Sequence, residues 1–455
     1  MAKKIIISLL ICTQFCGFCL AQQRNYDQEL YNLLAQEKII DAVDYYNEYS
    51  DSIYYQQTRD YFQINFDIAY NRYERAIDSL SAFIDKYCPD DEVRLSYLLW
   101  QVNLCFLNWD YQNGVNTFDK TYALLQSNPE LLKAYKTVVQ SLMSLRNLFY
   151  ELAKYPKMQI TNVADNEESV EIEIDTLNSI LTFPAQYNNQ YIKTMFDTGN
   201  AFPLFLDRKN AEMLGIRELG TLNNNGKDSV SIGIIDSIRI GNLLITNAMA
   251  AIMNDNYSKR CVSDTLDDRE AVNKINSIEK QIQIILGMPI IRQLHRIDFD
   301  LLNNKMVISN RNQNGNSNKS NIYLKNQSLY LQAFINGINF TSFIDTGGAN
   351  AFLYLYNAFQ KKHSGNIIVN DTARVYTESE CLVDGSEYVK YLLSAPCKFS
   401  LDDKAGITEI KTAVLQNSDV KIAKFAGDAY LGYGFLKKNF SRFSFNFDSM
   451  RFECE

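Results

Sequence analysis

Apolar residues in the first third of the chain recur at the spacing of an α-helix. Leu95, Leu98, Leu99, Val102 and Phe106 share one helical face. The surrounding segment, from residue 25 to about 155, is dense in Tyr, Leu, Ala and Gln and contains one glycine. This pattern predicts a helical domain over residues 22–157.

Three stretches of the helical region look alike, and their small residues Ala42, Ala76 and Gly114 stand 34 and 38 residues apart. A period of this size is typical of stacked helix pairs. The segment resembles tetratricopeptide-type repeats, down to Asn128-Pro129-Glu130 after the third stretch. An irregular helical bundle is the alternative. In both cases we expect a spacer or docking surface, because no cluster of ionisable residues suggests chemistry.

From about residue 160 the helical spacing fades, and short segments typical of β-strands take its place. Val170 to Ile174 alternates with acidic residues, and three apolar runs follow at Ile180 to Phe183, Ile232 to Ile240 and Ile282 to Leu286. An Asn, Ser and Lys run, Arg311 to Asn321, then interrupts the pattern. Such a run predicts a linker or surface loop between two halves.

The halves on either side of this linker share three landmarks. Two apolar residues lead into Asp197-Thr198-Gly199 in the first half and into Asp345-Thr346-Gly347 in the second. Ile285-Leu286-Gly287 then corresponds to Tyr430-Leu431-Gly432, and residues 297–300 correspond to 445–448. The three pairs are offset by 148, 145 and 148 residues, so the sequence contains an internal repeat.

With these motifs, residues 170–455 resemble bilobed aspartic proteases of the pepsin and retropepsin kind. Each lobe of that family carries an Asp-Thr-Gly loop and, later, two apolar residues and a glycine that pack behind it. The stretches after Gly287 and Gly432 look especially like bacterial retropepsin-like proteins. The resemblance implies a multidomain chain, α then all-β, in which the helical-repeat region precedes two pseudo-symmetric β-barrel lobes at 165–310 and 322–455, joined by the linker 311–321.

The resemblance implies that Asp197 and Asp345 are the catalytic pair of an aspartic-type endopeptidase. Two carboxyl groups about 3 Å apart cannot both ionise, so the pair holds one proton between them; pepsin is a known example. One carboxylate then takes a proton from water while its protonated partner polarises the peptide carbonyl. This chemistry needs no cofactor and no metal, and the partner it implies is a peptide or protein substrate.

Four further motif residues are expected to support the active-site loops. Gly199 and Gly347 let the backbone pass close to the carboxyl groups, where a Cβ would intrude. In the family, threonines at the positions of Thr198 and Thr346 interlock through their hydroxyls and fix the separation of the two carboxyl groups.

The residue after each motif departs from the Ser, Thr or Ala that is usual in the family. Asn200 follows the first motif and Gly348 the second. We expect the Asn200 side chain to donate a hydrogen bond to the outer oxygen of Asp197, which Gly348 cannot do for Asp345. This asymmetry leaves an alternative open: a catalytically weak or inactive, protease-like peptide-binding or scaffold protein with helical repeats.

Two candidate flaps lie between motif and tail. One spans Leu222 to Gly233 around the turn Asn223-Asn224-Asn225-Gly226, and the other spans Tyr376 to Tyr388 around Val383-Asp384-Gly385-Ser386. Both contain hairpin-type turn residues. They are read as flaps over a substrate or as ordinary surface hairpins.

The N-terminal segment and the net charge indicate where the protein is located and which partners are disfavoured. Lys3 and Lys4 precede the apolar run Ile5 to Leu20, and Cys19-Leu20-Ala21 offers a cleavage site, which predicts an export signal over residues 1–21. A membrane anchor is the alternative, although the run is short for a span. Removing both lysines changes the formal charge of the 455-residue chain from −8 to −10, which argues against nucleic acid as a partner. We expect a periplasmic or secreted protein without a membrane span.

The sequence lacks the residues that other catalytic mechanisms need. The chain has two histidines, His295 and His363, and no Walker-type phosphate loop, which disfavours catalytic triads and zinc sites. Six cysteines follow the export signal at spacings that match no disulfide framework, so disulfides and buried thiols both remain open. The helical region could bind a protein partner through its repeats, or cover the cleft as an inhibitory segment.

Overall fold

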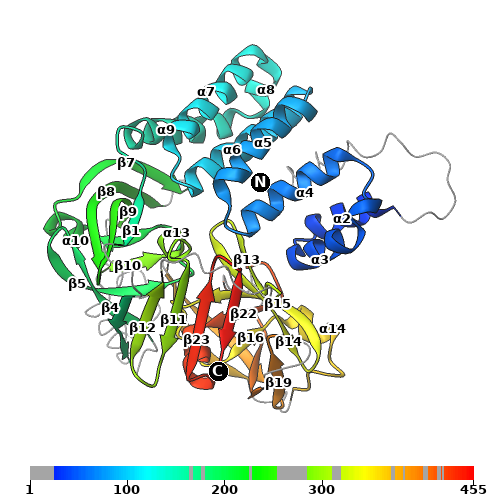
Figure 1. The fold of residues 1–455 in the computed structure, drawn as a ribbon, viewed down its shortest axis with the longest axis vertical. Coiled ribbons are helices and arrows are strands. Elements are labelled where there is room, and N and C mark those ends of the chain that lie inside the picture. Colours follow the sequence, from blue (N-terminus) through cyan, green and yellow to red (C-terminus); the bar gives the residue numbers. More distant parts are fainter. Residues whose placement is uncertain are drawn as a thin grey trace. The chain divides into compact units, whose positions relative to one another are not determined.

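The computed structural model describes residues 25–162, 168–175, 180–224, 228–253, 284–309, 319–369, 375–382, 385–402, 408–417, 422 and 425–455. The chain separates into two compact units, Met1–Lys157 and Met158–Glu455 (Figure 1). The predicted order, a helical region followed by a β-rich region, is confirmed. The predicted export signal lies outside the described residues, as do residues 311–318 of the predicted linker.

All the regular secondary structure described in the first unit is helical. Its elements are α2 (Tyr26–Ala35), α3 (Ile39–Tyr49), η1 (Ser50–Ser52), α4 (Gln56–Ala69), α5 (Tyr73–Tyr87), α6 (Asp91–Leu107), α7 (Tyr111–Ser127), α8 (Pro129–Ala134) and α9 (Lys136–Leu152).

Side-chain caps start several of these helices. Asp90 accepts hydrogen bonds from the second and third backbone N–H groups of α6, at 3.0 and 3.1 Å. Asp110 caps α7 by accepting from its third N–H, that of Asn113, at 3.2 Å. Asn128 caps α8 by accepting from the Leu131 N–H, and Pro129 in the first turn has no N–H that would need a partner. Capping residues next to these helices therefore mark where they begin.

The helices pack as sequential pairs. α2 packs on α3, α4 on α5 and α6 on α7. The small residues that suggested a repeat, Ala42, Ala76 and Gly114, lie in the second helix of each pair, and all three are buried. At Gly114 the missing side chain leaves space for the ring of Phe149 in α9, which a Cβ would meet at 2.1 Å. Membership of the tetratricopeptide class stays a prediction.

The second unit begins with a nine-stranded sheet in the described residues. Its order is β1-β9-β6-β10-β5-β4-β8-β7, with β3 beside β4, and β9 also pairs with β8, so the path closes on itself. The strands are β1 (Gln159–Asn162), β3 (Glu173–Asp175), β4 (Ile180–Tyr187), β5 (Gln190–Asp197), β6 (Leu204–Asp207), β7 (Arg217–Asn224), β8 (Asp228–Ile240), β9 (Leu243–Met253) and β10 (Ile284–Gly287).

A ten-stranded sheet follows in the second half, with the order β17-β18-β21-β16-β22-β15-β14-β19-β20 and β13 beside β14. Its strands are β13 (Ile322–Lys325), β14 (Ser328–Ile335), β15 (Ile338–Asp345), β16 (Leu353–Leu355), β17 (Tyr376–Leu382), β18 (Gly385–Leu393), β19 (Cys397–Ser400), β20 (Thr408–Ile410), β21 (Thr412–Leu415) and β22 (Ala429–Gly432).

The two sheets repeat one pairing pattern. β10 runs parallel to β5 and antiparallel to β6, and β22 runs parallel to β15 and antiparallel to β16. β6 is parallel to β9, as β16 is to β21. A short helix follows each of the strands β6, β16, β10 and β22, namely α10 (Arg208–Met213), α14 (Asn357–Lys362), α13 (Met288–Ile291) and α15 (Tyr433–Asn439). The internal repeat of the sequence thus reappears in the strand order.

A five-stranded sheet joins strands of both halves, in the order β2-β12-β11-β23-β24. Its strands are β2 (Glu168–Glu171), β11 (Arg296–Asp300), β12 (Lys305–Ser309), β23 (Arg442–Asn446) and β24 (Arg451–Cys454). β11 and β23 are antiparallel neighbours at its centre. The two strands begin 146 residues apart. The predicted correspondence of residues 297–300 with 445–448, an offset of 148 residues, is therefore wrong by two residues. The predicted strand Val170 to Ile174 is likewise two strands, β2 and β3.

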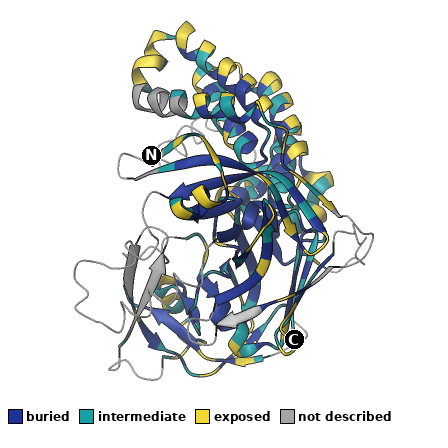
Figure 2. Cartoon of the chain, turned by 90° about the vertical axis from the view of Figure 1, so that its left-hand side faces the viewer, coloured by how far each residue is buried: buried dark blue, intermediate teal, exposed yellow. Residues whose placement is uncertain are grey.

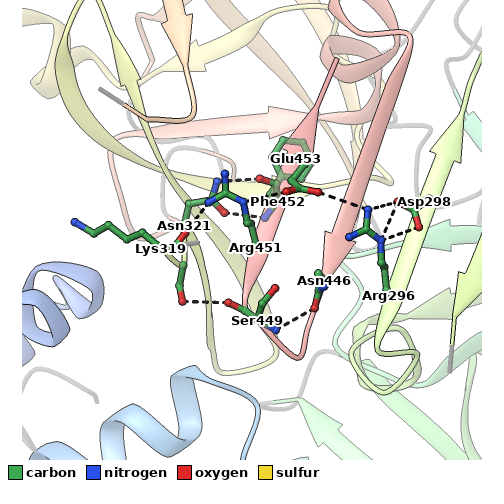
Figure 3. A network of polar contacts seen from close by, with 10 residues as sticks. Arg296, Asp298, Lys319, Asn321, Asn446, Ser449, Arg451, Phe452 and Glu453 are labelled. Atoms are coloured by element: carbon green, nitrogen blue, oxygen red, sulfur yellow. Dashed lines mark hydrogen bonds and ion pairs between the residues drawn. The ribbon is translucent and has the colours of Figure 1, made fainter. Parts of the chain in front are cut away.

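Polar contacts fasten the end of the predicted linker to this sheet (Figure 3). The Asn321 side chain donates to the Phe452 carbonyl at 2.9 Å and accepts from its N–H at 2.7 Å. Arg451 donates to the Lys319 carbonyl at 2.7 Å and pairs with Glu453. Residues 319–321 are therefore held in place along β24.

Burial follows the sheets (Figure 2). Dark blue runs along strands of the second unit. In the five-stranded sheet the buried rings of Phe299 and Phe443 stack with centroids 4.5 Å apart. Phe196, the residue before Asp197, packs edge-on against Phe299 at 5.1 Å. The shared sheet thereby supports the backbone that carries Asp197. None of the helices in the described ranges is long and apolar enough to cross a membrane.

Candidate active site

The two Asp-Thr-Gly motifs occupy equivalent positions at the ends of paired strands. β5 ends at Asp197 and β15 at Asp345. In the parallel pairing with the next strand, Gly287 lies opposite Asp197 and Gly432 opposite Asp345. Each predicted apolar-Gly segment therefore runs directly beside its own motif.

The two threonines interlock across the halves through four hydrogen bonds. The Thr198 hydroxyl donates to the Ile344 carbonyl at 3.0 Å and accepts from the Thr346 N–H at 3.0 Å. The Thr346 hydroxyl donates to the Phe196 carbonyl at 3.1 Å and accepts from the Thr198 N–H at 2.9 Å. Both threonines are fully buried. Because the donors and acceptors are reciprocal, neither turn can shift without breaking bonds in the other.

The carboxyl groups meet at this interlock. The Gly199 N–H donates to Oδ1 of Asp197 at 2.8 Å, and the Gly347 N–H donates to Oδ1 of Asp345 at 2.9 Å. Each glycine also lies against the opposite carboxyl. A Cβ on Gly199 would come within 2.5 Å of Asp345 Oδ1, and one on Gly347 within 2.7 Å of Asp197 Oδ1. Glycine is therefore required for the two groups to approach.

The electrostatics of the pair are those of two acids that share a site. Burial first, and then the charge of Asp345 and a hydrogen bond with it, raise the pKa of Asp197 well above its ordinary value of 3.8. The backbone N–H groups of Gly199 and Asn200 act in the opposite direction on this pKa. Burial and the neighbouring charge outweigh them, so Asp197 favours its protonated form.

Asn200 does not act as the sequence led us to expect. Its side-chain oxygen accepts a hydrogen bond from the Phe202 N–H at 3.1 Å, which makes a local turn, and its Nδ2 is buried without a partner among the described residues. The expected bond to the outer oxygen of Asp197 is therefore absent there. The Phe202 N–H, two residues away, binds the amide oxygen and fixes the side chain in a local turn, in which Nδ2 makes no described bond to Asp197.

Gly348 has no side chain, yet Asp345 does receive a side-chain hydrogen bond. The hydroxyl of Tyr430 in β22 donates to Asp345 Oδ2 at 2.8 Å. Sequence reasoning missed this residue. The signal was present in the repeat, because Tyr430-Leu431-Gly432 carries a tyrosine where Ile285-Leu286-Gly287 carries an isoleucine.

Both predicted flap segments form antiparallel hairpins. β7 pairs with β8, and β17 pairs with β18. Residues 225–227 and 383–384 at the two tips lie outside the described residues. A role as flaps stays a prediction.

Two other residues considered from the sequence lie on other elements. His295 precedes β11 and bonds Asp448 at 2.8 Å, a contact that raises the pKa of His295. His363 ends α14. Within the described ranges, no group of three or more His, Cys, Asp or Glu residues is arranged to hold a metal ion.

Comparisons with known proteins give weak similarities. No family model matches the sequence, and no curated protein matches it. Similar solved structures include a retropepsin-like aspartic protease from Rickettsia conorii, at 15% identity over 34% of this chain and 94% of that one, with a TM-score of 0.20. An aspartic proteinase from Irpex lacteus matches at 11% identity over 64% and 97%, with a TM-score of 0.35. Basic 7S globulin from soybean matches at 8% over 64% and 95%, with a TM-score of 0.32. Scores of this size add no argument, so the proposal below depends on the geometry of the chain itself.

Proposed function

We propose that the protein is an exported aspartic endopeptidase that hydrolyses peptide bonds between two lobes of one chain, with Asp197 and Asp345 as its catalytic pair. The observation that carries this proposal is the reciprocal interlock of Thr198 and Thr346, which sets two carboxyl groups from equivalent turns against each other. Export is proposed from the sequence of residues 1–21.

The raised pKa of Asp197 supports the chemistry. A protonated carboxyl can donate to the oxygen of a scissile carbonyl, while an ionised partner removes a proton from the attacking water. The water oxygen bonds to the carbonyl carbon as these two protons move, and no covalent bond to the protein forms. When the tetrahedral intermediate collapses, the carbon–nitrogen bond breaks and the amine takes a proton from the pair.

The test is cleavage of a peptide library by the purified chain and two variants. Asp197→Asn and Asp345→Asn keep the size of each side chain but cannot exchange the proton, so we expect both to abolish cleavage. Asp236→Asn, an exposed aspartate of β8, is the matched control and should cleave normally. A transition-state mimic of the pepstatin type should inhibit the wild type. Cleavage that persists in Asp197→Asn would sink the proposal.

A second candidate is a binding protein without turnover. The unpartnered Nδ2 of Asn200 favours it, because the residue after the first motif gives Asp197 no side-chain donor in the described structure. The helical unit has a hollow of about 620 Å³ lined by residues of α5, α6 and α7. A wild-type protein that binds the pepstatin-type mimic but cleaves no peptide would support this function over the first.

A further inference from the structure

Asp345 accepts hydrogen bonds on both of its oxygens. The Gly347 N–H occupies Oδ1 at 2.9 Å, and the Tyr430 hydroxyl occupies Oδ2 at 2.8 Å. Hydrogen bonds donated to a carboxylate favour its ionised form. Two titratable groups face Asp345 across the described contacts, Asp197 and Tyr430.

The ring of Tyr430 is held in place on several sides. The residue is 2% exposed and lies in β22, between β15 and β16. Its ring stands 5.8 Å from that of Phe343, 6.3 Å from that of Tyr354 and 6.2 Å from that of Phe425. A ring packed in this way has little freedom, so its hydroxyl is aimed at Asp345 before any substrate arrives.

Gly348 provides the space for that hydroxyl. A Cβ on Gly348 would lie 2.3 Å from the Tyr430 oxygen, a distance that non-bonded atoms do not tolerate. A side chain at position 348 and the tyrosine hydroxyl therefore exclude each other. The residue that looked like a defect in the second motif is the condition for Tyr430 to reach Asp345.

The first half has the opposite arrangement. By strand register, Ile285 lies opposite Met195 as Tyr430 lies opposite Phe343, and an isoleucine has no donor. Asn200 stands at the position of Gly348, but its donor atom, Nδ2, makes no hydrogen bond to Asp197 among the described contacts, and its amide oxygen accepts from the Phe202 N–H. Among the described contacts, a tyrosine hydroxyl reaches one carboxyl of the pair and not the other.

We propose that Tyr430 is a positioning residue that uses the space left by Gly348 to hold Asp345 as the ionised member of the pair, leaving the shared proton on Asp197. The effect of Tyr430 on turnover rests on the proposed peptidase function. Asp345 then takes the proton from water as the water oxygen bonds to the carbonyl carbon, and Asp197 gives its proton to the carbonyl oxygen.

Tyr430→Phe removes the hydroxyl and keeps the ring. Loss of a hydrogen bond to a charged group should move the acidic limb of the kcat profile to higher pH by about one to two units. KM should change little, because the hydroxyl is buried and its described partner is Asp345. Tyr433→Phe is the matched control: Tyr433 is a buried tyrosine of the same segment whose hydroxyl has no partner among the described residues. Its profile should equal that of the wild type.

Substitution of Gly348 gives an independent test. Gly348→Ser alone forces a side chain against the Tyr430 hydroxyl and should lower activity. Combined with Tyr430→Phe, the severe contact with the hydroxyl is gone, and the Cβ meets Asn350 Oδ1 at 3.0 Å and Cζ of residue 430 at 3.2 Å, distances that shifts of a few tenths of an ångström relieve. A serine hydroxyl can then lie beside Asp345, so the double variant should recover activity and the acidic limb of the wild type. Rescue of this kind is not expected if Tyr430 only fills space. Additive losses, or an unshifted profile in a folded Tyr430→Phe protein, would overturn the proposal.

The titration of the pair can also be followed without turnover. NMR of protein with ¹³C-labelled aspartate reports the two proton losses of the coupled carboxyls directly. We expect Tyr430→Phe to move the lower of the two steps upward in pH, and Tyr433→Phe to leave both in place. If the wild type cleaves no peptide but this shift occurs, the peptidase proposal fails and the role of Tyr430 stands. If cleavage occurs without the shift, the role of Tyr430 fails alone.

Discussion

The interlock of Thr198 and Thr346 can be tested by removing one hydroxyl. Thr198→Val keeps the shape of the side chain but leaves the Ile344 carbonyl and the Thr346 N–H without their partner. Both groups belong to fully buried residues, so no water replaces the lost bonds. An unsatisfied buried polar group costs about 1–3 kcal/mol. Thr198→Val should therefore lower the free energy of unfolding of this unit by about 2–6 kcal/mol, a large part of the roughly 5–15 kcal/mol of a typical domain.

Hydrogen exchange followed by mass spectrometry is the appropriate assay. Both tryptophans of the chain, Trp100 and Trp109, belong to the helical unit, so their fluorescence would not report on the β-rich unit. Peptides that contain Thr346 should lose protection in Thr198→Val. Thr346→Val should have an equal effect, because its hydroxyl makes the same two bonds in reverse. Thr161→Val is the control: its exposed hydroxyl donates to the Leu244 carbonyl at 3.3 Å, and water can replace that bond. Equal protection in all three variants would refute the claim that the threonines hold the turns together.

Three further predictions concern the carboxyl pair and its surroundings. Gly199→Ala should abolish peptide cleavage, because its Cβ would lie 2.5 Å from the opposite carboxyl, whereas Gly365→Ala, with no atom within 4 Å of its Cβ, should cleave normally. Because the pKa of Asp197 is raised in the folded protein, the folded protein holds this proton more tightly than the unfolded chain does above pH 3.8. The stability that Asp197 contributes is therefore complete below pH 3.8 and is lost as the pH rises through the raised pKa. Urea unfolding should therefore show Asp197→Asn gaining stability over the wild type as the pH rises, and a difference independent of pH would contradict this. The contact with Asp448 raises the pKa of His295 above 6.5, so its stabilisation is complete below that pH and fades above the raised pKa. Asp448→Asn should lower the His295 midpoint in a proton NMR titration, and an unmoved midpoint would exclude the contact.

The repeat made the centre of the site predictable. Asp197 and Asp345 could be paired because the motif and its apolar-Gly partner recur at nearly constant offsets, and the strand register places Gly287 and Gly432 beside them. Local residues also mark helix starts, as Asn128 and Pro129 do at α8. Features set by a few neighbouring residues, or by duplication, were accessible from the sequence.

Features set by tertiary packing were not accessible in the same way. The bond between Tyr430 and Asp345 joins residues 85 positions apart and depends on the register of β22 against β15. The side chain of Asn200 had two acceptable roles, and the nearby Phe202 N–H decided between them. The third landmark was misplaced because matching Phe-rich letters do not fix where a strand begins. In each case the contact depends on tertiary geometry that the neighbouring residues in the sequence do not determine.

The measurement that tests the central claim most directly is hydrolysis of a peptide in water enriched with heavy oxygen, analysed by mass spectrometry of both products and protein. If Asp197 and Asp345 activate water directly, the new carboxyl group carries one heavy oxygen, no covalent peptide adduct of the protein appears, and Asp197→Asn and Asp345→Asn give no product. An adduct on the protein, or labelled product from either variant, would contradict the account.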